Sequence, residues 1–151
     1  MAPSNTSNPD AAVRAGPSAN GYRAVRLGAD ERPVLLTVIS TEEEFDWHAP
    51  FDSRARSVRA MRSIDRAQGV FDAHGVKPAY VITYPVASQP DGWPLLKAYH
   101  DSRCCEIGAH LHPWVSPPPA ADISVENSYP GNLPAALVAE KGRALVAALP
   151  W

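Results

Sequence analysis

Three short stretches of the chain are apolar at almost every position. They occupy residues 34–39, 78–83 and 104–108, and the first reads Val-Leu-Leu-Thr-Val-Ile. Nearly unbroken apolar runs of this length that contain β-branched residues are typical of strands covered on both faces in a parallel sheet. The pattern therefore predicts three buried strands.

Helical spacing of apolar residues separates and follows these runs. Residues 54–73, 94–102 and 134–149 carry apolar side chains three or four positions apart, which predicts amphipathic helices. The resulting β-α-β-α-β-α order predicts an α/β fold, in which a parallel sheet is built by right-handed helical crossovers. Three such units fit half of a doubly wound sheet as well as the opening part of a (β/α) barrel.

The first 30 residues differ in composition from the rest of the chain. Residues 1–30 are rich in Ala, Pro, Ser, Asn and Gly and have no sustained periodicity, which predicts a flexible tail. Residues 31–151 form the predicted folded domain. The 45% hydrophobic and 20% charged residues of the chain are ordinary for a soluble globular protein.

Charge and hydropathy exclude some classes of partner. A formal net charge of -2 gives no electrostatic reason to expect nucleic acid or anionic lipid. No apolar stretch approaches a membrane-spanning length, and the opening residues lack the basic and apolar regions of a signal peptide. We therefore expect a cytoplasmic protein that binds neither nucleic acid nor membrane. The adjacent Cys104 and Cys105 are expected to be unpaired, buried strand residues.

Candidate metal ligands follow two of the predicted strands. Glu42, Glu43 and Glu44 come after the first strand, and His110 and His112 come after the third. Side chains beyond the carboxyl ends of parallel strands meet at one edge of the sheet, and a carboxylate with two imidazoles is a common zinc site. Two simpler interpretations stay open: histidines bonded to backbone or water, and glutamates in a solvated loop or in the first turn of a helix.

Four ordered segments of the chain resemble a known family. The segments are residues 34–47, 78–88, 106–114 and 127–133, and the resemblance spans about residues 33–150. Together they are similar to the amino-terminal half of a polysaccharide deacetylase of the NodB-like carbohydrate esterase group, and most similar to the branch called WalW.

The resemblance implies a fold and a metal site. The family fold is a distorted (β/α) barrel that holds a divalent ion, often zinc. The matching ligands in this sequence are Glu42, or less favourably Glu43, together with His110 and His112. The broader family usually spaces its two histidines as HxxxH, and here the position four residues after His110 is Trp114.

The resemblance also implies an activity, the release of acetyl groups from N-acetylated sugars. Trp47, Tyr84 and Trp114 are the expected sugar-binding residues. The family's general base is an aspartate at the first strand end, where this chain has Ser40, so Glu43 is the candidate catalytic base. The later family motifs would lie beyond residue 151. We therefore expect absent or very weak turnover.

A second hypothesis belongs to a different functional class. The chain would be a truncated, catalytically silent domain that acts at most as a binding or interaction module. Three β/α units leave open a sheet edge that a complete barrel would pair, and such an edge invites self-association.

Overall fold

The chain is divided into two units, residues Met1–Leu35 and Leu36–Trp151. The computed structural model describes residues 28, 32, 34–119 and 122–150. Apart from residue 28, the tail expected at residues 1–30 lies outside the described residues. The fold below is that of the second unit.

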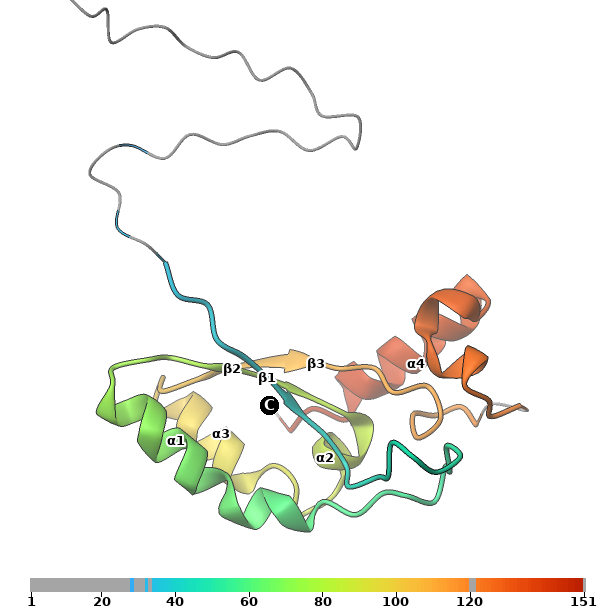
Figure 1. Cartoon of the computed structure of the whole chain (residues 1–151), viewed down its shortest axis with the longest axis horizontal. Helices are drawn as coiled ribbons and strands as arrows, with labels where there is room; N and C mark the ends of the chain where they lie inside the picture. The colour runs from blue at the N-terminus through green and yellow to red at the C-terminus, as the bar shows by residue number, and fades with distance from the viewer. Residues whose placement is uncertain (1–27, 29–31, 33, 120–121, 151) are drawn as a thin grey trace, which may run out of the picture. The chain divides into compact units, whose positions relative to one another are not determined.

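This unit contains a three-stranded parallel sheet (Figure 1). Its strands are β1 (Val38–Thr41), β2 (Ala79–Ile82) and β3 (Glu106–Ala109), in the order β1-β2-β3. Val38 pairs with Ala79, which pairs with Glu106, and the register continues to the strand ends. The prediction of an α/β fold with parallel strands is confirmed.

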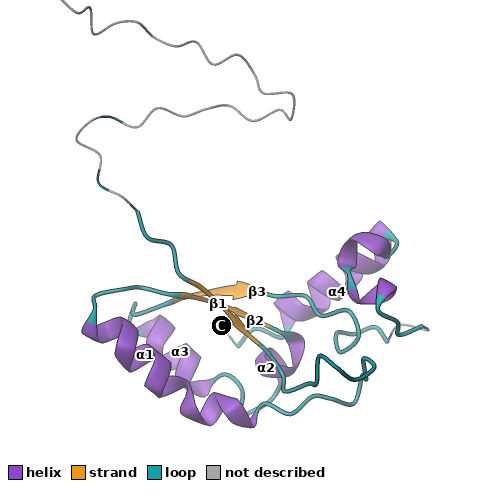
Figure 2. Cartoon of the chain, viewed as in Figure 1, coloured by secondary structure: helices purple, strands orange, loops and turns teal. Residues whose placement is uncertain are grey.

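Helices precede and follow the strands (Figure 2). In chain order they are the 3-10 helix η1 (Arg59–Ser63), α1 (Ile64–Ala73), α2 (Tyr84–Ser88), α3 (Pro94–Asp101), the 3-10 helices η2 (Glu126–Ser128) and η3 (Pro130–Asn132), and α4 (Ala135–Ala147). The predicted helix at 54–73 begins only at residue 59, because Arg54 lies in a turn and Ser57 forms an isolated bridge to Glu44. Helix α2 was not predicted from the sequence.

One face of the sheet carries the core. Ile39, Tyr80, Ile82 and Cys105 are part of a hydrophobic cluster with side chains from η1, α1, α2, α3 and α4. Figure 1 shows α1 and α3 on the same side of the sheet. Burial of these apolar side chains is the main stabilising term of the unit, at about 1.5–3 kcal/mol for each fully buried large side chain.

The opposite face of β1 is exposed, which corrects the expectation of a strand covered on both faces. Val38 is 62% exposed and Leu36 is 83% exposed. The paired strand also begins four residues later than predicted and extends to Thr41. The apolar pattern alone could not place these limits, because pairing with β2 defines them.

Two further predictions concern the cysteines and membrane-spanning segments. Both cysteines are unpaired as expected, but only Cys105 is buried, and both precede β3 instead of lying within it, because β3 begins two residues later than predicted. Within residues 34–119 and 122–150, no helix combines the length and the apolar composition required to cross a membrane.

Candidate metal centre

The three strands end side by side, and the residues that follow them form one rim. The register aligns the last residues of the strands, Thr41, Ile82 and Ala109. The Thr83 amide donates a hydrogen bond of 3.2 Å to the Thr41 carbonyl, and the His110 amide donates one of 2.9 Å to the Ile82 carbonyl. These bonds continue the ladder beyond the strands, so Glu42 and His110 start from fixed backbone positions.

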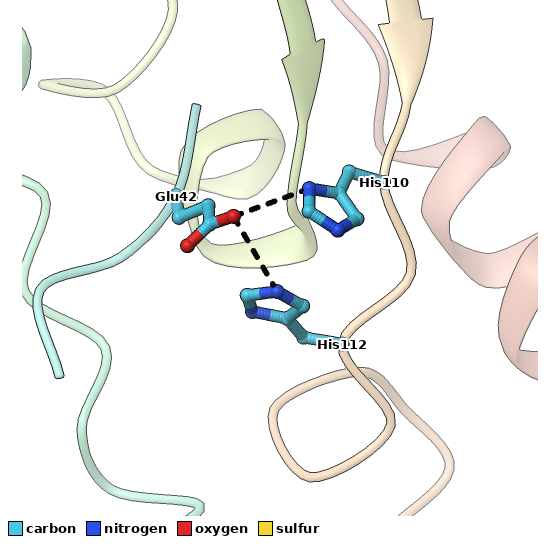
Figure 3. A group of neighbouring side chains, drawn as sticks. All are labelled: Glu42, His110 and His112. Atoms are coloured by element: carbon cyan, nitrogen blue, oxygen red, sulfur yellow. Dashed lines mark ion pairs between the residues drawn. The ribbon is translucent and has the colours of Figure 1, made fainter. Parts of the chain in front are cut away.

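Glu42 faces both histidines, whose rings lie next to each other (Figure 3). Its Oε1 atom is 3.4 Å from Nδ1 of His110 and 3.8 Å from Nε2 of His112. One ligand atom from each residue lies within 4.8 Å of the others. Ligand atoms bound tetrahedrally to zinc are separated by about 3.3–3.4 Å. The cluster predicted from the sequence is thus brought together, and it could hold a metal ion.

The two ring nitrogens of His112 face two different carboxylates. Nε2 faces Glu42, whereas Nδ1 lies 2.8 Å from Oε1 of Glu43. The ring is buried, stacks on Trp114 at a centroid distance of 4.2 Å, and meets the edge of Phe45 at 5.5 Å. These contacts restrict both the tilt and the rotation of the imidazole.

His110 is less enclosed than His112. Its side chain is 30% exposed, yet its Nδ1 atom is buried and has no hydrogen-bond partner. Burial, followed by the proximity of His112, lowers the pKa of His110, while Glu42 and Glu43 act in the opposite direction. The lowered pKa favours the neutral imidazole, which is the form that binds metals. A buried Nδ1 atom that has no hydrogen-bond partner and faces the Glu42 carboxylate is what we expect of a metal ligand.

Glu44 has a structural role that separates it from its two neighbours. Its Oε1 atom accepts a hydrogen bond of 2.7 Å from the Ala60 amide, and its Oε2 atom accepts one of 2.6 Å from the Ser57 hydroxyl. These bonds lower the pKa of Glu44. None of the three glutamates lies in the first turn of a helix, so that interpretation is wrong; Glu44 instead accepts a hydrogen bond from the first turn of η1.

A cleft of about 450 Å³ opens beside the two histidines, within the size range of small-ligand sites. Its lining residues are Trp47, Ala49, Phe51, His110, Leu111, His112, Trp114, Val125, Ser128, Tyr129 and Pro130. Trp47 and Trp114, two of the expected sugar-binding residues, are thus in the cleft. Trp47 is 67% exposed, whereas Trp114 is buried and forms part of the wall.

Tyr84, the third expected sugar-binding residue, lies in a different hollow. This second hollow, of about 220 Å³, is shared with Trp114 and Arg56. The Arg56 guanidinium lies 5.4 Å from the centroid of the Tyr84 ring. Trp114 is the residue common to both hollows.

Two residues near the site were not anticipated from the sequence. Tyr129 lines the cleft and is 64% exposed. Lys141 of α4 is completely buried, and its ammonium group donates hydrogen bonds to the carbonyls of Pro113, Ser116 and Pro118. The signal for Lys141 was its place on the apolar side of a helix, four residues before the buried Leu145.

Comparison with other proteins adds nothing to this geometry. No family model, no curated protein and no solved structure matches the chain.

Proposed function

We propose that the protein binds one divalent ion, with zinc the best fit, through Glu42, His110 and His112. The observation that carries the proposal is the meeting of one carboxylate oxygen and two imidazole nitrogens at the spacings given above. One carboxylate and two imidazoles form a frequent protein ligand set for catalytic zinc, and they leave a coordination position open. The unpartnered Nδ1 of His110 supports the same assignment.

We further propose that this site is hydrolytic, of the polysaccharide deacetylase type, and acts on acetyl groups of N-acetylated sugars. A bound ion at such a site supplies a polarised carbonyl and a water of lowered pKa. The cleft supports a sugar substrate because Trp47 and Tyr129 expose aromatic side chains beside the histidines. Tyr84 would contact a neighbouring part of the glycan, in the hollow that shares Trp114.

Neither Ser40 nor Glu43 gives this proposed site an accessible carboxylate for proton transfer. Ser40 is exposed on β1 and carries no carboxylate. The carboxylate of Glu43 is buried against His112. A missing general acid or base costs about 10²–10⁴-fold in rate. We therefore expect binding of metal and sugar with only slow acetate release.

The second candidate is a catalytically silent binding module. It is favoured by the same two observations, because neither Ser40 nor Glu43 offers a free carboxylate to a water in the cleft. Among the described residues, β1 and β3 are the outer strands of the sheet, and Leu36 and Val38 are exposed beside it. Self-association along β1 would accompany this second function.

Acetate release separates the two candidates. The zinc-supplemented protein would be incubated with acetylated chitooligosaccharides, with His112→Ala as the site control and Trp47→Ala as the cleft control. Slow release that requires zinc and His112 supports the hydrolase. Binding of the sugar without release favours the silent module. Release at about 1–10³ s⁻¹ would contradict the expected loss of proton transfer.

A further inference from the structure

Glu43 is the most deeply enclosed carboxylate of the acidic cluster. Its side chain has no exposed surface, and its Oε1 atom lies 2.8 Å from Nδ1 of His112. Its second oxygen, Oε2, is buried without a hydrogen-bond partner. A carboxylate removed from water requires a donor, and the Nδ1 atom of His112 is the only one that the structure provides among the described residues.

This contact determines which ring nitrogen of His112 carries the proton. A neutral imidazole has one N–H donor and one lone pair, and the proton resides on the nitrogen that faces an acceptor. With Glu43 as the acceptor at Nδ1, the lone pair is on Nε2, which is the atom that faces Glu42. The same arrangement of carboxylate, histidine and metal recurs in metalloproteins.

The surroundings of the ring reinforce this orientation. Trp114 stacks on one face of the imidazole with an interplanar angle of 22°, and Phe45 approaches it edge-on at 88°. A ring flipped by 180° would exchange Nδ1 with Cδ2 and Nε2 with Cε1, so ring carbons instead of nitrogens would face Glu43 and Glu42. The carboxylate and the aromatic rings together select a single orientation.

We propose that Glu43 is a positioning residue that fixes His112 as an Nε2 ligand, rather than the general base. The inference rests on the proposed metal site and deepens it. A general base must reach a water or a reacting group. The carboxylate of Glu43 is instead fully buried against the imidazole of His112. The adjacent glutamates then have distinct roles: Glu42 binds the ion and Glu43 orients a ligand.

The test compares Glu43→Leu, which removes the acceptor, with Glu43→Gln, which keeps a neutral one. Glu44→Gln is the matched control, because Glu44 is the next carboxylate along the chain and bonds Ala60 and Ser57 instead of a histidine. The tautomer of His112 would be read in the metal-free proteins by nitrogen-15 NMR at mildly alkaline pH. Zinc affinity would be measured by competition with a chelator.

We expect His112 of the wild type to carry its proton on Nδ1. Glu43→Leu should abolish this preference and weaken zinc binding by about 10–100-fold, a typical effect of losing such a partner. Glu43→Gln should keep the tautomer and lose less affinity, and Glu44→Gln should change neither property.

Two outcomes would overturn the role of Glu43. One is a wild-type His112 protonated on Nε2, which needs no variant to detect. The other is unchanged tautomer and zinc affinity in Glu43→Leu. Failure of the wild type to bind zinc would instead refute the proposed function, while the tautomer of the metal-free protein would still decide whether Glu43 orients His112.

Discussion

The two segments that supply the metal ligands are supported in very different ways. In the histidine segment, residues 109–118, positions 112–116 are all buried and Lys141 bonds three of its carbonyls. In the acidic segment, residues 41–51, positions 46–50 are all exposed. Beyond the rim it is attached through Glu44, which bonds Ser57 and Ala60, and through ring contacts of Phe45 and Phe51 with the histidine segment.

This contrast indicates how the site is organised. A ligand on a buried, hydrogen-bonded support keeps its geometry without the metal, whereas an exposed loop can adjust when a ligand arrives. We infer that the histidine segment is the fixed part of the site and that residues 46–50 of the acidic segment are its adaptable part. Substitutions in the supports of the two segments should therefore differ in effect.

The largest effect is expected from removing the support of the histidine segment. Lys141→Met would leave the carbonyls of Pro113, Ser116 and Pro118 buried without their donor. We expect a loss of about 2–4 kcal/mol in the free energy of unfolding. Urea denaturation of the metal-free protein measures this loss, and zinc affinity should fall with it.

Lys97→Met is the matched control for this change. Lys97 is a partly exposed lysine of α3 that pairs with Asp101 one helical turn away. Its replacement should leave the unfolding midpoint close to that of the wild type. Equal effects at the two lysines would show that Lys141 gives the histidine segment no special support.

A smaller effect is expected at the residue that bridges the two segments. The Phe45 ring contacts His112 at 5.5 Å and Trp114 at 5.4 Å across the site. Phe45→Leu keeps an apolar side chain but loses the ring contacts, so the free energy of unfolding should fall by about 0.5–1.5 kcal/mol. Trp47→Leu, in the exposed part of the acidic segment, should change it less. A larger loss at Trp47 would show that the loop is not adaptable.

The smallest effect, and a pH-dependent one, is expected at Glu44. Hydrogen bonds from Ser57 and Ala60 hold the pKa of Glu44 below its ordinary value of 4.5. The ionised carboxylate therefore stabilises the native state above about pH 4.5, and this contribution is lost as the pH falls through the lowered pKa. Thermal denaturation should show Glu44→Gln less stable than the wild type at neutral pH, with the difference shrinking in acid. A difference that is constant with pH would contradict this account.

The sequence was sufficient to predict the arrangement of the rim. Parallel strands put Glu42 and His110 at the same sheet edge although the two residues are 68 positions apart, and apolar runs are enough to find those strands. Helix α2 escaped prediction because Tyr84-Pro85-Val86-Ala87 directly follows a strand and is too short to show helical periodicity.

The roles of the three glutamates could not be assigned from the sequence. Adjacent residues of identical type differ only in the direction of their side chains, which depends on the turn that follows β1. The contact of Glu43 with His112 also depends on the ring orientation, which is set by Trp114 and Phe45. Tertiary packing rather than local pattern decides such assignments.

Zinc titration of the wild type and of His110→Ala tests the central claim most directly. His110 contributes the unpartnered Nδ1 atom that faces Glu42, so its removal leaves two of the three proposed ligands. The account predicts one zinc ion per wild-type chain and a severe loss of affinity in the variant. Equal affinity and stoichiometry in the two proteins would contradict it.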